Sequence, residues 1–362
     1  LLWIKNRNNV ERNFLFDTVR GVDSSKALVS NDTSAEGTNG INATTISTID
    51  DGFRIVESSI SSGELYFNSR TYIAWGWDAG DGDPVSNTTG DINSTVKAND
   101  ATGFSVVSYT GNGTNGATVG HGLSTTPSVV IVKDRNNTNN WAVYHKDLTS
   151  TSHSLVLNST SAETNYGSSF IAPASSTLSL ANGSQLNASS RAYIAYCFSE
   201  VSGVSKFGSY SGTGSAGNAI TGLGFRPGFL MIKNATSASD WLIMDTTRNP
   251  FNPANIPLAP DATTAESSFG TTNRNIDFDS DGFTIQSTAA GGTTALNASG
   301  NTYTYMAFKG SYSDYVSPLN DTGTIDSRVK AYPDKGFSIV SWKGTGSAGT
   351  IGHGLNAAAS VL

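Results

Sequence analysis

Three copies of one pattern run through the sequence, and this repetition constrains the fold more than any single motif does. The opening of the pattern is GFSVVSY at residues 103–109, and it recurs as GFSIVSW at residues 336–342. Both openings lead to GHGL, at residues 120–123 and 352–355. A more divergent copy opens with KFGSY at residues 206–210 and leads to GLGF at residues 222–225.

Four further landmarks recur in the same order in each copy: an apolar run ending in lysine, an apolar run with aromatic residues, an Ala-Glu pair, and an aromatic strand. They lie at 129–133, 141–144, 162–163 and 192–198 in one copy, at 229–233, 241–245, 265–266 and 302–308 in another, and at 1–5, 13–17, 35–36 and 71–77 in the remaining copy. Five landmarks shared in one order by three copies indicate a true repeat.

The repeated segments have the features of β-strands. Each candidate is about 5–8 residues long and is bounded by Gly, Asn, Asp or Ser. Residues 193–196 alternate in the way that is typical of a half-buried antiparallel strand. No segment sustains the 3.6-residue period of a helix. The sequence therefore predicts an all-β fold of tandem antiparallel β-sandwiches, jelly-roll or lectin-like, with about seven strands in each.

One copy of the repeat is split between the two ends of the chain. We expect a sandwich at residues 1–79 that is completed by the opening strands at 336–362 of a neighbouring or continuing copy. Two whole repeats occupy 103–205 and 206–310, and related connectors occupy 80–102 and 311–335. The two pieces of the split repeat add up to roughly 105 residues, a common domain size.

Both pieces of the split repeat need a partner. A piece of about 27 residues cannot bury a core of its own, and a sandwich without its opening strands has an unpaired edge. Either the chain continues into another copy, or one subunit completes the next by strand addition, which propagates into a filament. The chain starts without Met, so we expect an excerpt or a processed subunit. The predicted assembly residues are Leu1, Leu2, Trp3, Ile4, Phe337, Ile339, Val340, Trp342, Val361 and Leu362.

Composition excludes several classes of partner. The net charge of −7 and pI of about 5.1 argue against nucleic acid, because phosphate binding needs a basic surface. The single cysteine, Cys197, excludes a disulfide framework. The sequence contains no run of about 20 apolar residues, so membrane insertion is not predicted, and no signal peptide is visible.

The landmarks resemble an uncharacterised β-sandwich repeat of phage tail-fibre-like and other virion-associated proteins from aquatic environments. The residues that carry the resemblance are 336–342, 352–355, 141–146, 192–198 and 75–80. It covers nearly the whole chain, with Leu223 in place of the histidine as the clearest departure. The resemblance implies structural material that is extracellular or on the virion surface, and it supplies no catalytic residues.

The sequence offers two kinds of candidate metal ligand, aspartates and histidines. Asp277, Asp279 and Asp281 match the front half of a calcium loop, but Thr288 stands where the bidentate glutamate belongs, and an ordinary turn is the alternative. Asp78, Asp81 and Asp83 form a second acidic loop. His121 and His353 lie between glycines, and because Leu223 replaces them in the remaining copy, packing in a tight turn is the better interpretation.

Two further features bear on function. Trp75 and Trp77 are candidates for stacking on sugar rings, although core packing of these rings is favoured. Three glutamates, Glu36, Glu163 and Glu266, stand at equivalent positions, which is typical of a structural role. Asn-X-Ser/Thr motifs occur at Asn42, Asn87, Asn158, Asn187 and Asn297, among others.

These observations favour a non-enzymatic structural subunit or repeat of an extracellular or virion-associated fibre, whose partner is another copy of itself. The alternative is an adhesin that binds host-surface glycans. A polysaccharide-degrading enzyme is a minor alternative, because no set of convergent catalytic groups stands out.

Overall fold

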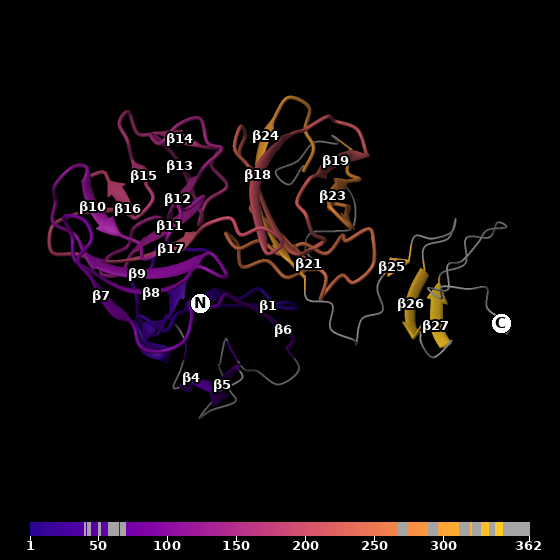
Figure 1. Cartoon of the computed structure of the whole chain (residues 1–362), viewed down its shortest axis with the longest axis horizontal. Helices are drawn as coiled ribbons and strands as arrows, with labels where there is room; N and C mark the ends of the chain where they lie inside the picture. Colours follow the sequence, from indigo (N-terminus) through magenta and orange to yellow (C-terminus); the bar gives the residue numbers. More distant parts are fainter. Residues whose placement is uncertain are drawn as a thin grey trace. The chain divides into compact units, whose positions relative to one another are not determined.

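The computed structural model describes residues 1–39, 41, 45–49, 52–56, 65, 70–266, 274–288 and 296–310, and the strands at 319–320, 327–332 and 337–342. The chain forms two compact units, Leu1–Lys309 and Gly310–Leu362 (Figure 1). Apart from one short 3-10 helix, η1 (Ser24–Lys26), the regular elements of the described residues are strands in antiparallel sheets. The predicted all-β class is confirmed.

The second repeat is a sandwich of two sheets. The larger has the order β14-β13-β12-β11-β17-β9-β8-β7 and the smaller has the order β10-β16-β15. Between them lies an apolar core that includes Val107, Val130 and Leu178. The strands are β7 (Val85–Asn87), β8 (Ser94–Asn99), β9 (Phe104–Thr110), β10 (Ala117–Gly120), β11 (Val129–Asp134), β12 (Ala142–His145), β13 (His153–Val156), β14 (Thr164–Asn165), β15 (Ile171–Pro173), β16 (Thr177–Leu180) and β17 (Ala192–Phe198).

The third repeat has the same plan, with a sheet of order β18-β24-β20-β21 over a sheet of order β19-β23-β22. Its own core includes Leu230, Phe283 and Tyr305. The strands are β18 (Ser205–Ser211), β19 (Asn218–Thr221), β20 (Pro227–Asn234), β21 (Leu242–Asp245), β22 (Ile276–Asp279), β23 (Gly282–Ile285) and β24 (Thr302–Lys309).

The first repeat has a main sheet of order β3-β2-β1-β6 and a hairpin of β4 and β5. Its core includes Ile4, Phe14 and Ile46. The strands are β1 (Leu2–Asn6), β2 (Asn13–Phe16), β3 (Leu28–Val29), β4 (Thr45–Ile49), β5 (Gly52–Val56) and β6 (Tyr72–Gly76). The order β2-β1-β6 matches β12-β11-β17 of the second repeat and β21-β20-β24 of the third, but the described residues of the first repeat provide no opening strand beside β6.

The predicted connectors themselves contain strands. β7 and β8 lie in the segment 80–102 and extend the main sheet of the second repeat next to β9. In the unit Gly310–Leu362, β25 (Leu319–Asn320), β26 (Ser327–Tyr332) and β27 (Phe337–Trp342) form a three-stranded sheet in that order. Ser94 lies opposite Tyr109 in the first set, and Ser327 lies opposite Trp342 in the second. The sheet β25-β26-β27 is therefore a copy of β7-β8-β9.

A shared core joins the three repeats. Each main sheet turns its second face to one apolar cluster, to which the repeats contribute Trp3 and Trp75, Ile131 and Tyr196, and Met231 and Met306, among others. All six residues of β11 are buried in consequence. The half-buried strand expected at residues 193–196 is likewise buried on both faces, because a second sheet covers one side and the neighbouring repeats cover the other.

The contacts between repeats form a closed cycle. At each boundary, a side-chain N–H at one equivalent position donates to a main-chain carbonyl of the preceding repeat. The pairs are Trp141 and Val29 at 2.8 Å, Trp241 and Val156 at 3.0 Å, and Asn13 and Ala259 at 3.3 Å. The first repeat contacts the second, the second contacts the third, and the third contacts the first.

A buried lysine stands at each boundary as well. Lys5, Lys133 and Lys233 occupy equivalent positions and are at most 1% exposed. The ammonium of Lys233 donates to the carbonyls of Thr160, Asn234 and Ser239, at 2.9–3.0 Å. Burial lowers the pKa of Lys233 and of Lys133 to about 8, and that of Lys5 to about 7. Each lysine ties its own loop to the neighbouring repeat.

We expect Lys233→Met to lower the free energy of unfolding by roughly 3 kcal/mol, because three carbonyls lose their donor. Thermal unfolding monitored by circular dichroism would measure the loss. Lys309→Met is the control, because Lys309 is exposed and the same change there should leave stability nearly unchanged. Equal stability of the two variants would contradict a role for Lys233 in holding the repeats together.

Candidate assembly interface

The predicted assembly residues at the N-terminus belong to a strand that is paired on both sides. In β1, Trp3 lies opposite Leu15 of β2 and opposite Trp75 of β6. The pairing with β6 extends by one residue, because the N-terminal amino group of Leu1 donates to the Trp77 carbonyl and the Trp77 amide donates to the Leu1 carbonyl, each at 2.9 Å. Trp3 and Ile4 are buried. Neither side of β1 is therefore open to a further strand.

The open edge of this sheet belongs to β6. In the second repeat, the equivalent strand β17 lies between β11 and β9, and in the third repeat β24 lies between β20 and β18. β6 pairs with β1 alone among the strands that the structure describes. The missing neighbour is the opening strand of the repeat.

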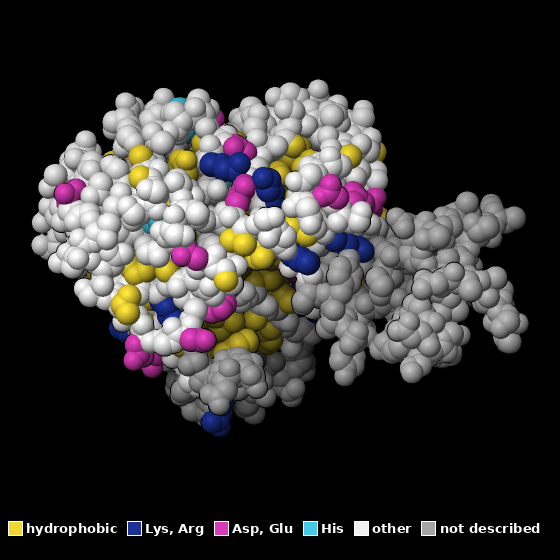
Figure 2. Space-filling model, in the orientation of Figure 1, with side chains coloured by type: hydrophobic (Ala, Val, Ile, Leu, Met, Phe, Trp, Pro, Cys, Tyr) yellow, Lys and Arg dark blue, Asp and Glu magenta, His cyan; other side chains and the backbone are white. Residues whose placement is uncertain are grey.

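Burial shows what the opening strand would cover. Residues Tyr193 to Phe198 of β17 are all buried, and so are Tyr303 to Ala307 of β24. In β6, by contrast, Trp75 is buried while Tyr72, Ile73 and Ala74 are only half-buried and Gly76 is exposed. Figure 2 shows hydrophobic side chains gathered on the surface where Figure 1 places β1 and β6. A strand beside β6 would bury this apolar surface.

The residues predicted at the other end of the chain lie partly outside the described region. Phe337, Ile339, Val340 and Trp342 belong to β27, which pairs with β26 through Phe337 opposite Tyr332 and Val340 opposite Val329. Val361 and Leu362 lie outside the described residues, as does His353. β27 is the outer strand of its sheet, so one of its edges has no partner in the described part of the unit.

Both tryptophans proposed for glycan binding make contacts between repeats. Trp75 is 8% exposed, and its indole N–H donates to the carboxylate of Asp245 in the third repeat at 3.3 Å. The half-buried ring of Trp77 lies 5.4 Å from that of Phe229 and 5.7 Å from that of Phe308, both edge-on. These aromatic contacts join the first repeat to its neighbours in the shared core.

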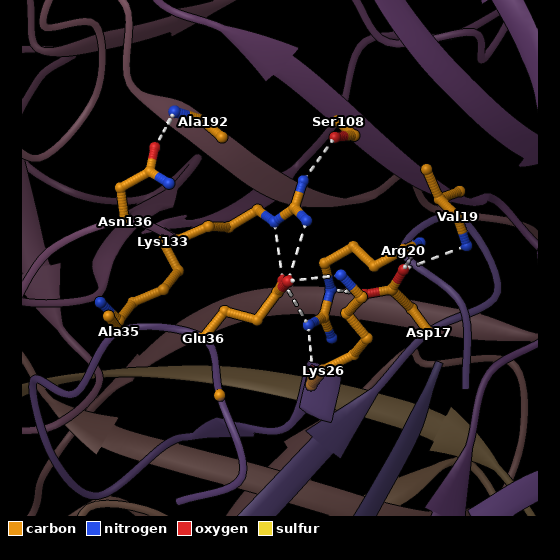
Figure 3. A network of polar contacts seen from close by, with 12 residues as sticks. Asp17, Val19, Arg20, Lys26, Ala35, Glu36, Ser108, Lys133, Asn136 and Ala192 are labelled. Carbon is orange, nitrogen blue, oxygen red and sulfur yellow. Dashed lines mark hydrogen bonds and ion pairs between the residues drawn. The ribbon is translucent and has the colours of Figure 1, made fainter. Parts of the chain in front are cut away.

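A buried network of charges joins the first repeat to the second (Figure 3). Glu36 accepts from Arg135 at 2.7 Å and from Arg20 at 3.0 Å, and Arg20 also pairs with Asp17. The phenol of Tyr196 donates to Asp17 at 2.8 Å. Burial opposes ionisation of Asp17, yet the Arg20 guanidinium holds its pKa below the ordinary value. The carboxylates are thus fully engaged in ion pairs.

The three equivalent glutamates all lie at boundaries between repeats. The backbone N–H groups of Glu36, Glu163 and Glu266 donate to carbonyls of Arg135, Ala235 and Arg7 respectively, each at 2.9 Å. Glu266 also pairs with Arg7 at 2.7 Å and with Arg248 at 3.0 Å. The repeated Ala-Glu landmark therefore marks the contact of each repeat with the next.

The calcium candidates have donors within the protein. Asp277 accepts from the Gln286 amide at 2.6 Å, and Asp279 accepts from the Thr284 hydroxyl at 2.7 Å. Asp281 accepts from the backbone N–H groups of Gly222 and Gly224, so it shapes a turn between strands. Within the described residues, no three His, Cys, Asp or Glu side chains gather as metal ligands do. Calcium binding stays a prediction.

The histidines hold turns and boundaries. His121 is fully buried, its Nδ1 accepts from the Leu123 amide, and its Nε2 contacts the Ala174 carbonyl at 3.1 Å. His145 lies at the boundary with the third repeat, 3.1 Å from the Tyr305 carbonyl. Burial lowers the pKa of His145 to about 4, so the ring is neutral at physiological pH.

Two of the Asn-X-Ser/Thr motifs serve the fold. Asn187 and Asn297 are fully buried, and their amides hold the glycine loops that follow the opening strands. A Cβ at Gly111 would lie 2.3 Å from the Ala188 carbonyl oxygen, and one at Gly212 would lie 2.1 Å from that of Ala298. Only glycine permits such a close approach, and these two asparagines are not accessible to a glycosylating enzyme in the folded protein.

Sequence reasoning missed a pair of acids in the third repeat. Asn158 accepts from the Trp141 amide and donates to Asn140 at 2.9 Å in the second repeat. At the equivalent positions the third repeat has Asp261, which accepts from the Trp241 amide, and Asp240. Burial, with the negative charge of Asp240, raises the pKa of Asp261 to about 7. Comparison of the aligned repeats, in which two asparagines become aspartates, was the available signal.

The raised pKa of Asp261 makes stability depend on pH. A carboxyl whose pKa is raised on folding favours the folded state at low pH, and this contribution is lost as pH rises from about 4 to about 7. We therefore expect Asp261→Asn to raise the Tm by several degrees at pH 8 and by little at pH 4. The reverse change in the second repeat, Asn158→Asp, should lower the Tm more at pH 8 than at pH 4. A pH-independent effect of both changes would contradict this assignment.

The comparison with protein families gives one result. The sequence matches a family described as a domain of unknown function, DUF7483, over residues 1–311 and again over residues 315–362. The chain therefore belongs to this family. No match was found among the curated proteins or among the solved structures. In the described residues, no helix is long and apolar enough to cross a membrane.

Proposed function

We propose that the chain is a structural subunit or repeat of an extracellular or virion-associated fibre, which assembles head to tail through its split first repeat. The observation that carries the proposal is the open edge of β6, together with a separate sheet, β25-β26-β27, built like the one that fills the same edge in the second repeat. The fibre is formed by copies of the same chain.

An open strand edge beside apolar surface favours the addition of another strand. The N–H and C=O groups of residues 73–76 of β6 that point away from β1 are a template for backbone pairing, and burial of the half-buried side chains of Ile73 and Ala74 adds hydrophobic stabilisation. The receiving edge and the donated sheet are different surfaces of the chain. Such a heterologous contact does not close on itself by symmetry, so repetition of it extends a linear polymer.

Two further features support a structural role. The repeats are joined through a shared core and buried charge networks, which is suited to a rigid building block. The family match comes in two stretches, 1–311 and 315–362, which divide close to the boundary between the two compact units. Two successive matches to one family are typical of material built from successive copies.

The alternative functions find less support. Of the two tryptophans considered for glycan binding, Trp75 belongs to the shared core and the half-buried Trp77 packs against it. The repeated glutamates engage in contacts between repeats and with their own loops. No specific observation in the described residues therefore favours an adhesin or a polysaccharide-degrading enzyme over a structural protein.

Deletion of residues 336–362 tests the proposal. We expect the deleted variant to fold and remain soluble but to form no polymers, because it lacks the donated strand β27. Electron microscopy and analytical ultracentrifugation would compare it with the full chain, which should form extended polymers. Circular dichroism of the variant is the control for folding. Long fibres from the variant, or none from the full chain, would show that the proposal is wrong.

A further inference from the structure

We infer that β27 of one copy pairs antiparallel with β6 of a second copy in a single register, with Trp342 opposite Tyr72 and Phe337 opposite Trp77. The inference rests on the proposed function and adds the partner strand, its direction and its register. It follows from the internal repeats, in which the same pairing occurs twice within the chain.

The position of β6 in the repeat is fixed by its neighbour β1. The buried lysines mark equivalent positions, and Lys133 lies opposite Ile194 while Lys5 lies opposite Ile73. Ile73 is thus equivalent to Ile194. Counting along both strands makes Tyr72 equivalent to Tyr193 and Trp77 equivalent to Phe198.

The position of β27 is fixed by its neighbour β26. Ser327 lies opposite Trp342 just as Ser94 lies opposite Tyr109, so Trp342 is equivalent to Tyr109. In the second repeat Tyr109 lies opposite Tyr193. Transferred to the first repeat, this pair places Trp342 opposite Tyr72.

The third repeat gives the same register independently. Tyr210 lies opposite Tyr303 at the same level of the sheet. The rings of Tyr109 and Tyr193 are stacked with centroids 5.2 Å apart, and those of Tyr210 and Tyr303 are stacked at 5.0 Å.

The inferred register sends apolar residues of β27 to both cores. Ile339 takes the position of Val106 and Phe207, which belong to the shared core. Val340 takes the position of Val107, which belongs to the core of the second sandwich. The alternation of β27 therefore suits the two apolar surfaces beside β6, and a shift by one residue would exchange them.

A second copy is the inferred donor. β25, β26 and β27 all lie in the second of the two stretches that match the family, residues 315–362. Because their sheet is also built like β7-β8-β9, which opens the second repeat, we infer that they open a new copy of the pattern and do not complete the stretch before it. The first repeat that they complete belongs to the copy that follows.

Engineered cysteines test the register across two chains. Gly76 and Ser338 lie opposite each other in the inferred pairing, at the position where Cys197 lies opposite Ser105 in the second repeat. A Cβ at Gly76 meets no atom within 4 Å, so Gly76→Cys is compatible with the fold. The native Cys197 is buried and its pKa is raised to about 12, so it stays unreactive.

Chains with Gly76→Cys are mixed with chains with Ser338→Cys, and oxidised glutathione is added. We expect a disulfide-linked dimer on a denaturing gel, which reductant converts to monomer. Ser341→Cys is the matched control in place of Ser338→Cys, because its inferred partner is Ile73, about 10 Å from Gly76 along the strand. This control pair should give at most one tenth of the dimer.

The outcomes separate the inference from the proposed function. If fibres form but both cysteine pairs give equal dimer, or neither gives any, the register is wrong while the fibre stands. If the double variant Gly76→Cys/Ser338→Cys instead forms the disulfide within one chain and the mixture gives no dimer, the donor is the chain's own segment and a second copy is wrong. Absence of both fibres and disulfides would overturn the proposed function as well.

Discussion

Each main sheet of this protein is buried on both faces, and this constraint governs the rest of the structure. One face packs on the smaller sheet of its own repeat, and the other packs into a core that all three repeats share. A strand in such a sheet needs a paired neighbour on each side and apolar side chains on each face. The closed cycle of contacts, with its buried lysines and arginines, holds the three sheets around that core.

β6 meets only part of this constraint. Its buried Trp75 reaches the shared core and bonds to Asp245, while the edge away from β1 has no strand beside it in the described residues. The second and third repeats show what belongs there, because β9 and β18 fill the same edge. The fold thus indicates that the missing part is an opening strand beside β6, and it identifies β27 as the segment of sequence equivalent to that strand.

Much of the fold could be predicted from sequence, because each repeat consists of short strands whose landmark residues align between the three copies. The apolar runs became β1, β11 and β20, and the Ala-Glu pair became a boundary contact. The cycle of repeats could not be predicted, since it depends on side chains such as Trp141 and Asn13 whose partners are distant in the chain. One signal was present but unused: Val129 to Val132 is apolar without alternation, which indicates burial on both faces.

The central claim is that β6 has an open edge that assembly closes. Hydrogen exchange followed by mass spectrometry measures this directly, because backbone N–H groups that point to an unpaired edge exchange with solvent quickly. In unassembled protein, about half of the amides of β6 should exchange much faster than those of β17 and β24, and in the assembled fibre they should become equally slow. Amides of β6 that are as protected as those of β17 before assembly would contradict the account.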